Sequence, residues 1–348
     1  MNVIPHITES LRLEGCTILG ALSITTAIRD AVTVIHGPSG CTQHNFSLLH
    51  ATFLADGIAA LPHLLSTHLT EDEIIFGGEE VLETLLKDIS APGPGCIFVL
   101  STCIVDTIGD DTSAVCRKSW GVPVIYLPTA GFLGGGFNQG LINTLMTLSH
   151  RIEPVEKQPL TVALIGEKNL EYEVETNYAE ITRLLNLLGV RVELRFVRDL
   201  CFADIDRLGG AALNILREPL LAPVGQMLEW KFGTPFIDCM PEGFSGTLRF
   251  LAEVAHHLDL DAPPALRKET AHQDEVCAKF ADFRGVAVNF GAEHRLSGIP
   301  AIDEVVTTLG LQPTGEGVML PLPVPVPIGT AGMERLLHRW RRVIHVSL

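Results

Sequence analysis

Short apolar runs rich in β-branched residues recur along the chain, and each ends at a Gly, Pro, Ser or Thr and is followed by a helical stretch. This alternation is typical of parallel sheets, because parallel strands need long crossover connections that are usually helices. The predicted strands are 31–37, 96–102 and 122–129 in the first part of the chain, 160–166, 190–196, 211–216 and 234–240 in the second, and 285–291 in the third.

The strands fall into three groups, which predicts an α/β fold of three Rossmann-like units with parallel sheets. Polar, proline-containing segments at 150–159 and 259–269 separate the groups. We therefore expect an N-terminal domain over 1–150, a second domain over 160–258, and a third, truncated domain over 270–348 that ends in a basic helix. In "MLPLPVPVPIG" (319–329) the alternating prolines favour an extended packing segment over a central strand.

Composition excludes several classes of function. The chain is 47% hydrophobic but has no run of about 18 uncharged apolar residues, so we expect no membrane span. Its start lacks the pattern of an export signal, which predicts a cytoplasmic location. The formal net charge of −16 argues against binding to nucleic-acid backbones. In a reducing compartment the eight cysteines should mostly be core residues rather than disulfides.

The segment "VIHGPSGCTQHNF" (34–46) is the first candidate site. The predicted strand ends at His36, a tight turn covers 37–40, and a helix should start near Thr42. Cys41 is then at or near a helix N-terminus, whose free N–H groups and partial positive charge favour thiolate and lower the pKa. The segment lacks the lysine and the spacing of a phosphate-binding loop. It therefore predicts a metal-binding thiolate rather than a nucleotide site.

Two further cysteines stand out by their local context. Cys103 follows the strand at 96–102, at the edge where open α/β sheets bind ligands, and Cys16 precedes a stretch of small residues that allows close packing. The spacing of Cys16, Cys41 and Cys103 matches no short zinc motif, so only the fold could bring them together. From the residues alone, both a shared cluster and separate core positions remain open. For Cys96, Cys116, Cys201, Cys239 and Cys277, core packing is the favoured interpretation, although Cys239 also lies near a strand end.

The motifs "EGC", "HGPSGC", "EDEIIFGGEE" and "STC" occur in this order, and "PTAGFLGGGFNQGLINTL" and "PFIDCMPEGFSGTLRFL" follow. Together they resemble the nitrogenase component 1 family. The resemblance implies that Cys16, Cys41 and Cys103 hold an iron–sulfur cluster at a subunit interface, here expected as [4Fe–4S]. Such clusters usually have four ligands. The fourth could come from this chain or from a partner, or the two sets of three could meet in a homodimer.

The short length and the ending "GTAGMERLLHRW" make the chain most similar to subunits of nickel-sirohydrochlorin a,c-diamide reductive cyclases, which act in coenzyme F-430 synthesis. This resemblance implies a homodimer, a nickel tetrapyrrole substrate, and a partner reductase similar to nitrogenase iron protein that hydrolyses MgATP. Ring reduction and lactam closure would follow. The alternatives are a related reductase of a protochlorophyllide-type or methylthio-alkane substrate, and a scaffold for metal-cluster assembly. No counterpart of the ligands of the iron–molybdenum cofactor is recognisable, so dinitrogen reduction is not expected.

Ring reduction also needs protons, and histidine is the natural donor near neutral pH. His44 lies on the predicted helix after the turn at 37–40, and His68 lies on a predicted loop beside three acidic residues. We consider both as candidate proton donors, against the alternative that they are solvated surface residues. The segment "GGGF" (134–137) could bind an anion through its N–H groups, but a close-packing turn is the favoured interpretation.

Overall fold

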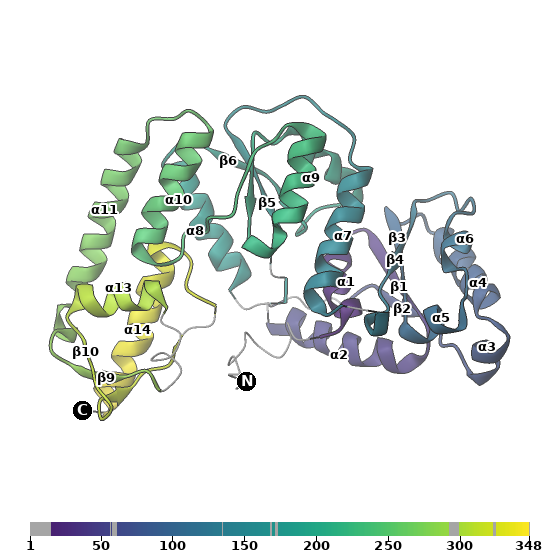
Figure 1. Cartoon of the computed structure of the whole chain (residues 1–348), viewed down its shortest axis with the longest axis horizontal. Helices are drawn as coiled ribbons and strands as arrows, with labels where there is room; N and C mark the ends of the chain where they lie inside the picture. Colours follow the sequence, from purple (N-terminus) through teal and green to yellow (C-terminus); the bar gives the residue numbers. More distant parts are fainter. Residues whose placement is uncertain are drawn as a thin grey trace.

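The computed structural model describes residues 15–347 except 56, 58–60, 134, 168, 171–172, 292–298 and 323–324. In this part of the chain, the strands form three separate sheets, and every paired strand within them is parallel. Figure 1 shows the sheets arranged side by side along the molecule, with helices between them. The predicted α/β class with parallel sheets is confirmed.

The first sheet has the order β2-β1-β3-β4. Its strands are β1 (Ala31–His36), β2 (Leu64–Ser66), β3 (Cys96–Ser101) and β4 (Val124–Pro128). The central strand β3 is buried at every position, as its continuous apolar sequence predicts for a strand covered on both faces. Helices α2 (Ser39–Ala55), α4 (Glu79–Ser90) and α6 (Thr112–Cys116) connect the strands, together with the short α3 (Glu71–Phe76) and α5 (Cys103–Ile108).

The second sheet has the order β6-β5-β7-β8. Its strands are β5 (Thr161–Ile165), β6 (Arg191–Phe196), β7 (Leu213–Leu216) and β8 (Phe236–Ile237). Its connections are α8 (Val174–Asn186), α9 (Ala222–Phe232), α10 (Gly243–His257) and the 3-10 turns η3 (Phe202–Gly210) and η4 (Pro219–Leu221). All seven strands predicted before residue 241 therefore exist, and β2 is an additional short strand.

Two helices lie between the first and second sheets, α1 (Thr17–Thr25) and α7 (Phe137–Arg151) (Figure 1). They pack backbone to backbone, because a Cβ atom on Gly20 would lie 1.9 Å from the carbonyl oxygen of Phe137. A Cβ atom on Gly140 would lie 2.0 Å from the carbonyl oxygen of Thr17. One hydrophobic cluster runs through this layer and joins the first two sheets into a common core.

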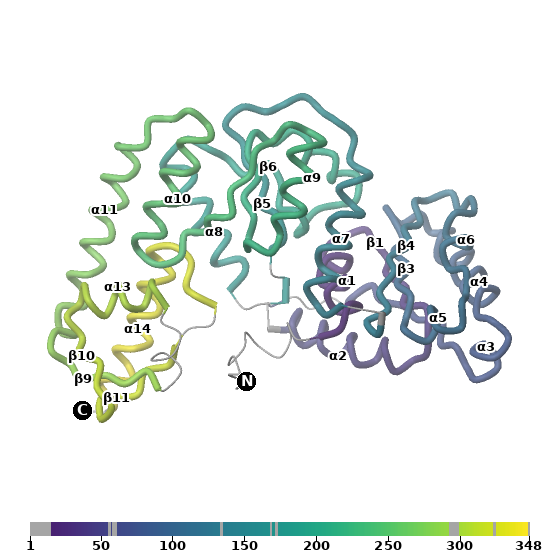
Figure 2. Tube along the Cα trace, in the orientation of Figure 1, coloured from purple at the N-terminus to yellow at the C-terminus, as the bar shows by residue number. Residues whose placement is uncertain are grey.

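The third sheet is small, with the order β10-β9-β11. Its strands are β9 (Ala287–Asn289), β10 (Gln312–Pro313) and β11 (Val318–Met319), and its helices are α11 (Ala262–Lys279), α13 (Pro300–Leu309) and α14 (Gly329–Ser347), with the short turn η5 (Ala281–Phe283). Figure 2 shows this region at the end of the molecule opposite to the first sheet. Helix α11 runs across the boundary predicted at 259–269, and the three-domain division stays a prediction.

The C-terminal helix α14 is basic, as its sequence indicates, but several of its cations are paired. Arg339 and Arg335 contact Glu173, and Arg341 contacts Asp282. Trp340 is fully buried in the core of the third region. This helix is thus an integral packing element. None of the helices in the described ranges combines the length and apolarity needed to cross a bilayer.

Candidate iron–sulfur site

Cys41 and Cys103 lie at the carboxyl edge of the first sheet. They follow β1 and β3, which are neighbours in parallel register with His36 opposite Ser101. Cys41 is in the first turn of α2, and Cys103 is the first residue of α5. The two turns touch closely, because a Cβ atom on Gly37 would lie 2.3 Å from the hydroxyl oxygen of Thr102. Glycine is therefore required at position 37 for this approach.

Cys16 reaches the same place from a different direction. It is the residue before α1 and pairs with Gly136 in an isolated antiparallel bridge. A Cβ atom on Gly131 would lie 3.6 Å from the Cβ atom of Cys16, so Cys16 lies against the turn η2 (Gly131–Leu133). Because η2 also contacts α5, this turn joins the segment of Cys16 to the helix that begins with Cys103.

The charges of Cys16 and Cys103 both act on Cys41, as expected for side chains in one neighbourhood. Burial raises the pKa of the Cys41 thiol, and the charges of Cys16 and Cys103 raise it further. The expectation of a lowered pKa at the helix N-terminus is therefore wrong for this fold, since burial and two neighbouring thiolates outweigh the helix end. A bound metal reverses this balance, because it binds thiolate and releases the proton.

The donor set suits a cluster rather than one ion. All three cysteines are free, with Cys16 exposed and Cys41 and Cys103 half-buried. Within the described ranges, no three His, Cys, Asp or Glu side chains converge closely enough to hold a single metal ion. In an iron–sulfur cluster each thiolate binds a different iron, so the sulfurs lie farther apart than around one ion. Three converging thiols that are open on one side fit this requirement.

The two predicted proton donors lie near the cysteines but at the surface. His44 is exposed on α2, one helical turn after Cys41. His68 is exposed in the loop before α3, and its Nδ1 lies 2.8 Å from the hydroxyl of Ser39 in the first turn of α2. The structure thus brings His68 to the turn that carries Cys41. A role in proton transfer stays a prediction for both residues.

A buried polar group that no sequence motif indicates lies next to this turn. His36 is fully buried, with Nε2 3.4 Å from Oδ2 of Asp110 and Nδ1 3.0 Å from Oγ1 of Thr67. Burial lowers the pKa of His36, although Asp110, Glu79 and Asp106 oppose the shift. The motifs "HGPSGC" and "IGDD" contain His36 and Asp110, but no local signal indicates that the two side chains meet.

The other cysteines do not join the site. Cys96 and Cys116 are buried in the core on opposite faces of the first sheet, and burial raises the pKa of Cys116 to about 12. Cys239 follows β8 and packs against the core of the second sheet, and Cys277 packs in the third region. Cys201 lies before η3, where its sulfur accepts a weak hydrogen bond from Arg29. The core interpretation is confirmed for Cys96 and Cys116.

The segment 134–137 packs against α1 where it is described. Thr17 donates a hydrogen bond to the carbonyl oxygen of Gly135, and Gly136 forms the bridge to Cys16. These contacts are those of a close-packing turn. Its function is to hold Cys16 in place.

Exposed apolar side chains lie on α5, which begins with Cys103, and on the two elements that contact it. Ile75 and Phe76 on α3 are 71% and 85% exposed, Ile104 on α5 is 37% exposed, and Phe132 on η2 is 85% exposed. Both α3 and η2 contact α5. We call Ile75, Phe76, Ile104 and Phe132 the apolar patch. Clustered exposed apolar residues on a globular protein are typical of interaction surfaces.

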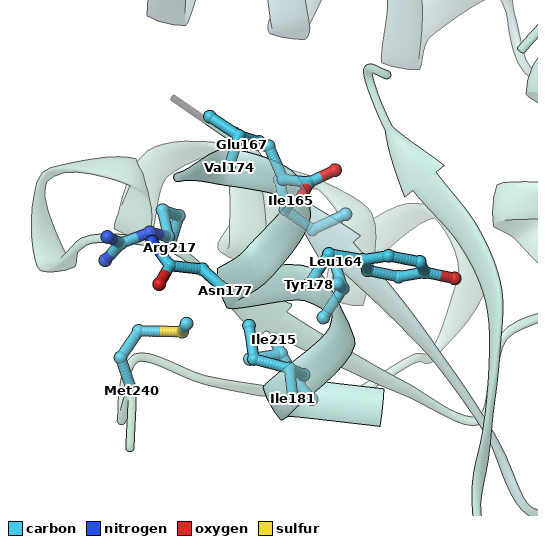
Figure 3. A pocket seen from close by; sticks show the side chains of 10 residues that line it. All are labelled: Leu164, Ile165, Glu167, Val174, Asn177, Tyr178, Ile181, Ile215, Arg217 and Met240. Carbon is cyan, nitrogen blue, oxygen red and sulfur yellow. The ribbon is translucent and has the colours of Figure 1, made fainter. Parts of the chain in front are cut away.

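A second candidate site lies at the carboxyl edge of the second sheet. Figure 3 shows a pocket against the ends of β5 and β7, with Glu167 and Arg217, which follow these strands, among its side chains. The strand order reverses between β5 and β7. Ligands of open α/β sheets bind at such reversal points. This position is therefore the expected place for a small molecule.

Two neighbouring spaces extend from this edge to the first sheet, and we call them together the crevice. The larger spans about 1150 Å³, open solvent at its mouth included, and is lined by the segment after α1 (26–31), by α2 and by the loops after β5 and β6. The smaller lies beside Ser23 of α1 and Phe137 of α7. Both share Asn169 and Leu170.

Paired charges border the crevice. Arg195 binds Glu167 at 2.6 Å and Glu175 at 2.9 Å, and its guanidinium lies 4.0 Å from the ring centre of Tyr178. Burial opposes the charge of Arg195, but the two carboxylates outweigh it and raise its pKa. Arg198 also binds Glu175, at 2.6 Å. The crevice thus has an apolar interior with ion pairs at its border.

Comparison with known protein families assigns the chain to one of them. A model described as nitrogenase component 1 type oxidoreductase matches residues 16–302. The chain belongs to the nitrogenase component 1 type oxidoreductase family. The matched range begins at Cys16 and includes Cys41 and Cys103.

Curated members of this component 1 family resemble the chain along most of its length. The nitrogenase iron-molybdenum cofactor biosynthesis protein NifE of Clostridium pasteurianum is 30% identical over 277 residues, 77% of this chain and 59% of that protein. The nitrogenase molybdenum-iron protein alpha chain of Methanococcus maripaludis is 28% identical over 68% of this chain and 52% of that protein. The chain therefore spans less than two thirds of the length of these relatives.

Solved component 1 structures share the fold. The structure titled nitrogenase Cp1 at pH 6.5 superposes with a TM-score of 0.67 and 22% identity, covering 90% of this chain and 62% of that chain. The structure titled nitrogenase Cp1 at pH 5 gives the same TM-score at 20% identity over 99% of this chain. The likeness extends to the third region of the molecule.

Proposed function

We propose that the chain is the catalytic subunit of an ATP-dependent, nitrogenase-like reductase, and that Cys16, Cys41 and Cys103 hold a [4Fe–4S] cluster. The convergence of three free thiols from three distant segments carries this proposal. When bound, such a cluster supplies one-electron transfer. The chain's own part is to hold the thiolates on rigid elements and to keep a substrate within reach of them.

The crevice is the proposed substrate site. Helix α1 begins after Cys16, and Ser23 and Thr26 near its end line the crevice. Nine helical residues at 1.5 Å each correspond to about 14 Å, so one short helix separates the two sites. Phe137 lines the smaller space and directly follows Gly136, the bridge partner of Cys16. Rigid packing between α1 and α7 thus fixes the distance between cluster and substrate.

The proposed substrate is a nickel tetrapyrrole, nickel-sirohydrochlorin a,c-diamide, which is reduced and closed to a lactam. A large, mostly apolar space suits a macrocycle, and cations at its border suit the carboxylates that the macrocycle carries. Arg29 and Arg198 are those cations, next to Asp199 at 3.3 Å and Glu175 at 2.6 Å. A substrate carboxylate would exchange with one of these partners. His44 and His68 are the proposed proton donors; because they lie on the cluster side, their protons would reach the crevice through intervening groups.

A separate reductase similar to nitrogenase iron protein is the proposed source of electrons, and it hydrolyses MgATP. The apolar patch is the proposed docking surface, because it lies on α5, which begins with Cys103, and on the elements that contact α5, and because its exposed side chains are stabilised by leaving water. Cys16 is exposed, which leaves the cluster open to a second copy of the chain. We therefore also propose a homodimer whose interface covers the cluster.

The proposal is tested with protein purified without oxygen and reconstituted with iron and sulfide. Added reductase and MgATP should change the absorption spectrum of nickel-sirohydrochlorin a,c-diamide. A reduced cluster without any spectral change of the tetrapyrrole would refute the proposed substrate.

Cys41→Ala should abolish the visible absorbance of the cluster, because only two of the three proposed thiolate ligands remain. Cys277→Ala is the matched control, since this half-buried cysteine lies in the third region. Equal cluster content in both variants would refute the ligand assignment.

A metal-cluster assembly scaffold is the second candidate, favoured by the 30% identity to a cofactor biosynthesis protein. A scaffold releases its cluster to an acceptor and converts no organic substrate. Mixing iron-labelled protein with metal-free acceptor protein distinguishes the two. Transfer of the label without turnover of the tetrapyrrole would favour the scaffold.

A further inference from the structure

A buried chain of polar contacts connects the junction of α3 and α4 with the turn that carries Cys41. The N–H of Gly78 donates to Oδ2 of Asp110 at 2.9 Å, and the same oxygen lies 3.4 Å from Nε2 of His36. On the other side of the imidazole, Nδ1 lies 3.0 Å from Oγ1 of Thr67, which accepts the N–H of Gly37 at 2.9 Å. We call these five residues the positioning chain.

The direction of each hydrogen bond follows from the chemistry of the groups. A carboxylate oxygen only accepts, so the 3.4 Å polar contact with Oδ2 of Asp110 favours the tautomer of His36 that carries its proton on Nε2, although the geometry is not that of a full hydrogen bond. Burial disfavours a second proton on the ring, so Nδ1 is an acceptor. Thr67 then accepts from Gly37 and donates to His36. One tautomer of His36 is compatible with all of these contacts, of which the approach of Nε2 to Asp110 is a polar contact rather than a hydrogen bond.

Helix α3 is attached in a way that allows it to move. None of its residues is buried, and it contains only six residues. Gly77, with φ of 102°, and Gly78 join it to α4, and a Cβ atom on Gly78 would lie 3.0 Å from Oδ2 of Asp110. Elements with little buried surface open at low free-energy cost. The exposed Phe76 is the residue directly before these glycines.

We propose that the positioning chain transmits a displacement of α3 to the turn of Cys41, so that docking of the reductase on the apolar patch adjusts how readily the cluster accepts an electron. This inference rests on the proposed function for the identity of the docking partner. His36, Thr67 and Asp110 are positioning residues, since they act through the backbone of the turn at Gly37. Movement of Gly78 alters the hydrogen bond to Asp110, and His36 and Thr67 relay the change to Gly37.

The first test uses metal-free protein and amide hydrogen exchange. Thr67→Val keeps the side-chain shape but removes the hydroxyl, so exchange in residues 37–41 should become about tenfold faster, the equivalent of one lost hydrogen bond. Thr67→Ser restores the hydroxyl and should restore protection. Asp110→Asn should act like Thr67→Val, whereas Glu83→Gln, which removes a surface carboxylate of α4, should have no effect. Unchanged exchange in both Thr67→Val and Asp110→Asn would overturn the proposal.

The second test measures the reduction potential of the reconstituted protein, alone and with the reductase held in complex by MgADP. In the wild type, docking should change the equilibrium constant for accepting one electron by about tenfold, which corresponds to a shift of the reduction potential of about 59 mV. Asp110→Asn should lose most of this shift while its affinity for the reductase stays unchanged. Phe76→Ala should instead weaken the affinity.

A shift of equal size in the wild type and Asp110→Asn would refute the coupling. Absence of any shift in the wild type would refute it as well. A wild-type protein that binds no iron would instead refute the proposed function, and the exchange experiment still decides whether the positioning chain exists.

Discussion

Cys16 differs from the other seven cysteines because it alone is exposed. Its backbone is fixed by the bridge to Gly136, whereas its sulfur faces solvent. Cys96 and Cys116 are the opposite extreme, with fully or nearly fully buried thiols whose pKa is raised by burial. Thiol chemistry on the folded protein should therefore separate site cysteines from core cysteines.

Brief treatment of the metal-free protein with iodoacetamide at pH 8 should modify Cys16 first and leave Cys96 and Cys116 unmodified. Thiolate is the reactive form, and a pKa of about 12 leaves very little of it on Cys116 at this pH. Peptide mass spectrometry measures the modified fraction. Reaction of Cys116 as fast as that of Cys16 would contradict the described burial, and modification in denaturant is the positive control.

His36 gives a prediction for stability against pH. Its pKa is lowered in the folded protein, mainly by burial, from an ordinary value of 6.5. Below pH 6.5 the unfolded chain binds a proton on His36 that the folded chain resists. The free energy of unfolding should therefore decrease as the pH is lowered below 6.5, by at most about 1.4 kcal/mol per pH unit. Urea unfolding at pH 5.5 and 7.5 measures this change. His36→Gln should show a shallower dependence, and an equal slope would contradict the prediction.

At the scale of elements, helices α1 and α7 approach each other so closely that their contact requires glycine. Gly20 and Gly140 each face a carbonyl oxygen of the other helix so closely that no side chain fits. Because Cys16 directly precedes α1 and Gly136 directly precedes α7, the separation of these helices also sets the position of Cys16.

Gly20→Ala should destabilise the protein by about 1–3 kcal/mol, the usual cost of forcing extra atoms into a packed core. Gly246→Ala is the matched control, because its Cβ atom would make only ordinary contacts at 3.9 Å or more within helix α10. Thermal unfolding compares the two variants. A smaller loss for Gly20→Ala than for Gly246→Ala would contradict the described packing.

The elements show where sequence was sufficient. Strand β3 was predicted because a central strand of a parallel sheet is a continuous apolar run. Helix α1 was not predicted, because all nine of its residues are buried and the sequence therefore has no polar face with a helical period. Strand β2 has only three residues, too few for a pattern. Local sequence therefore predicts elements that have one solvent-exposed face or a long apolar run, and misses elements that are buried on all sides.

The same limit applies to the site. Cys41 and Cys103 could be placed from the strand ends that precede them, because neighbouring parallel strands end at one edge. The position of Cys16 depends on its pairing with Gly136, and the burial that raises the pKa of Cys41 depends on packing around it. The contact between His36 and Asp110 is likewise a product of tertiary structure. Such long-range contacts leave no periodic signal in the sequence.

At the scale of the whole molecule, a charged network joins the second and third regions. Arg183 on α8 binds Glu180 at 2.7 Å and Glu269 on α11 at 2.8 Å, and Thr330 on α14 also donates to Glu269. Glu269 is fully buried, and although burial opposes its charge, the hydrogen bonds from Arg183 and Thr330 lower its pKa overall. The network therefore fixes the third region to the second through three helices.

Glu269→Ala should destabilise the protein by about 1.5–3 kcal/mol, because it removes the hydrogen bonds that Arg183 and Thr330 donate to a buried carboxylate, while Arg183 keeps its ion pair with Glu180. Glu83→Ala, which breaks the exposed pair with Lys118, should cost less than about 1 kcal/mol. Urea unfolding monitored by tryptophan fluorescence suits the comparison, since Trp340 is buried in the third region. Similar losses in both variants would contradict a special role of the network.

The position of Cys16 before α1 has a consequence for the time at which iron can be bound during synthesis. Ribosomes release the N-terminal part of a chain first, at about 5–20 residues per second. Cys41 and Cys103 can take their places once β4 has emerged, but Cys16 has no fixed partner until α7 is made. Asn169, whose side chain bonds the carbonyl oxygens of Ser23 and Val197, then ties α1 to the second sheet. A nascent chain released before this point would present only two ordered thiols to incoming metal.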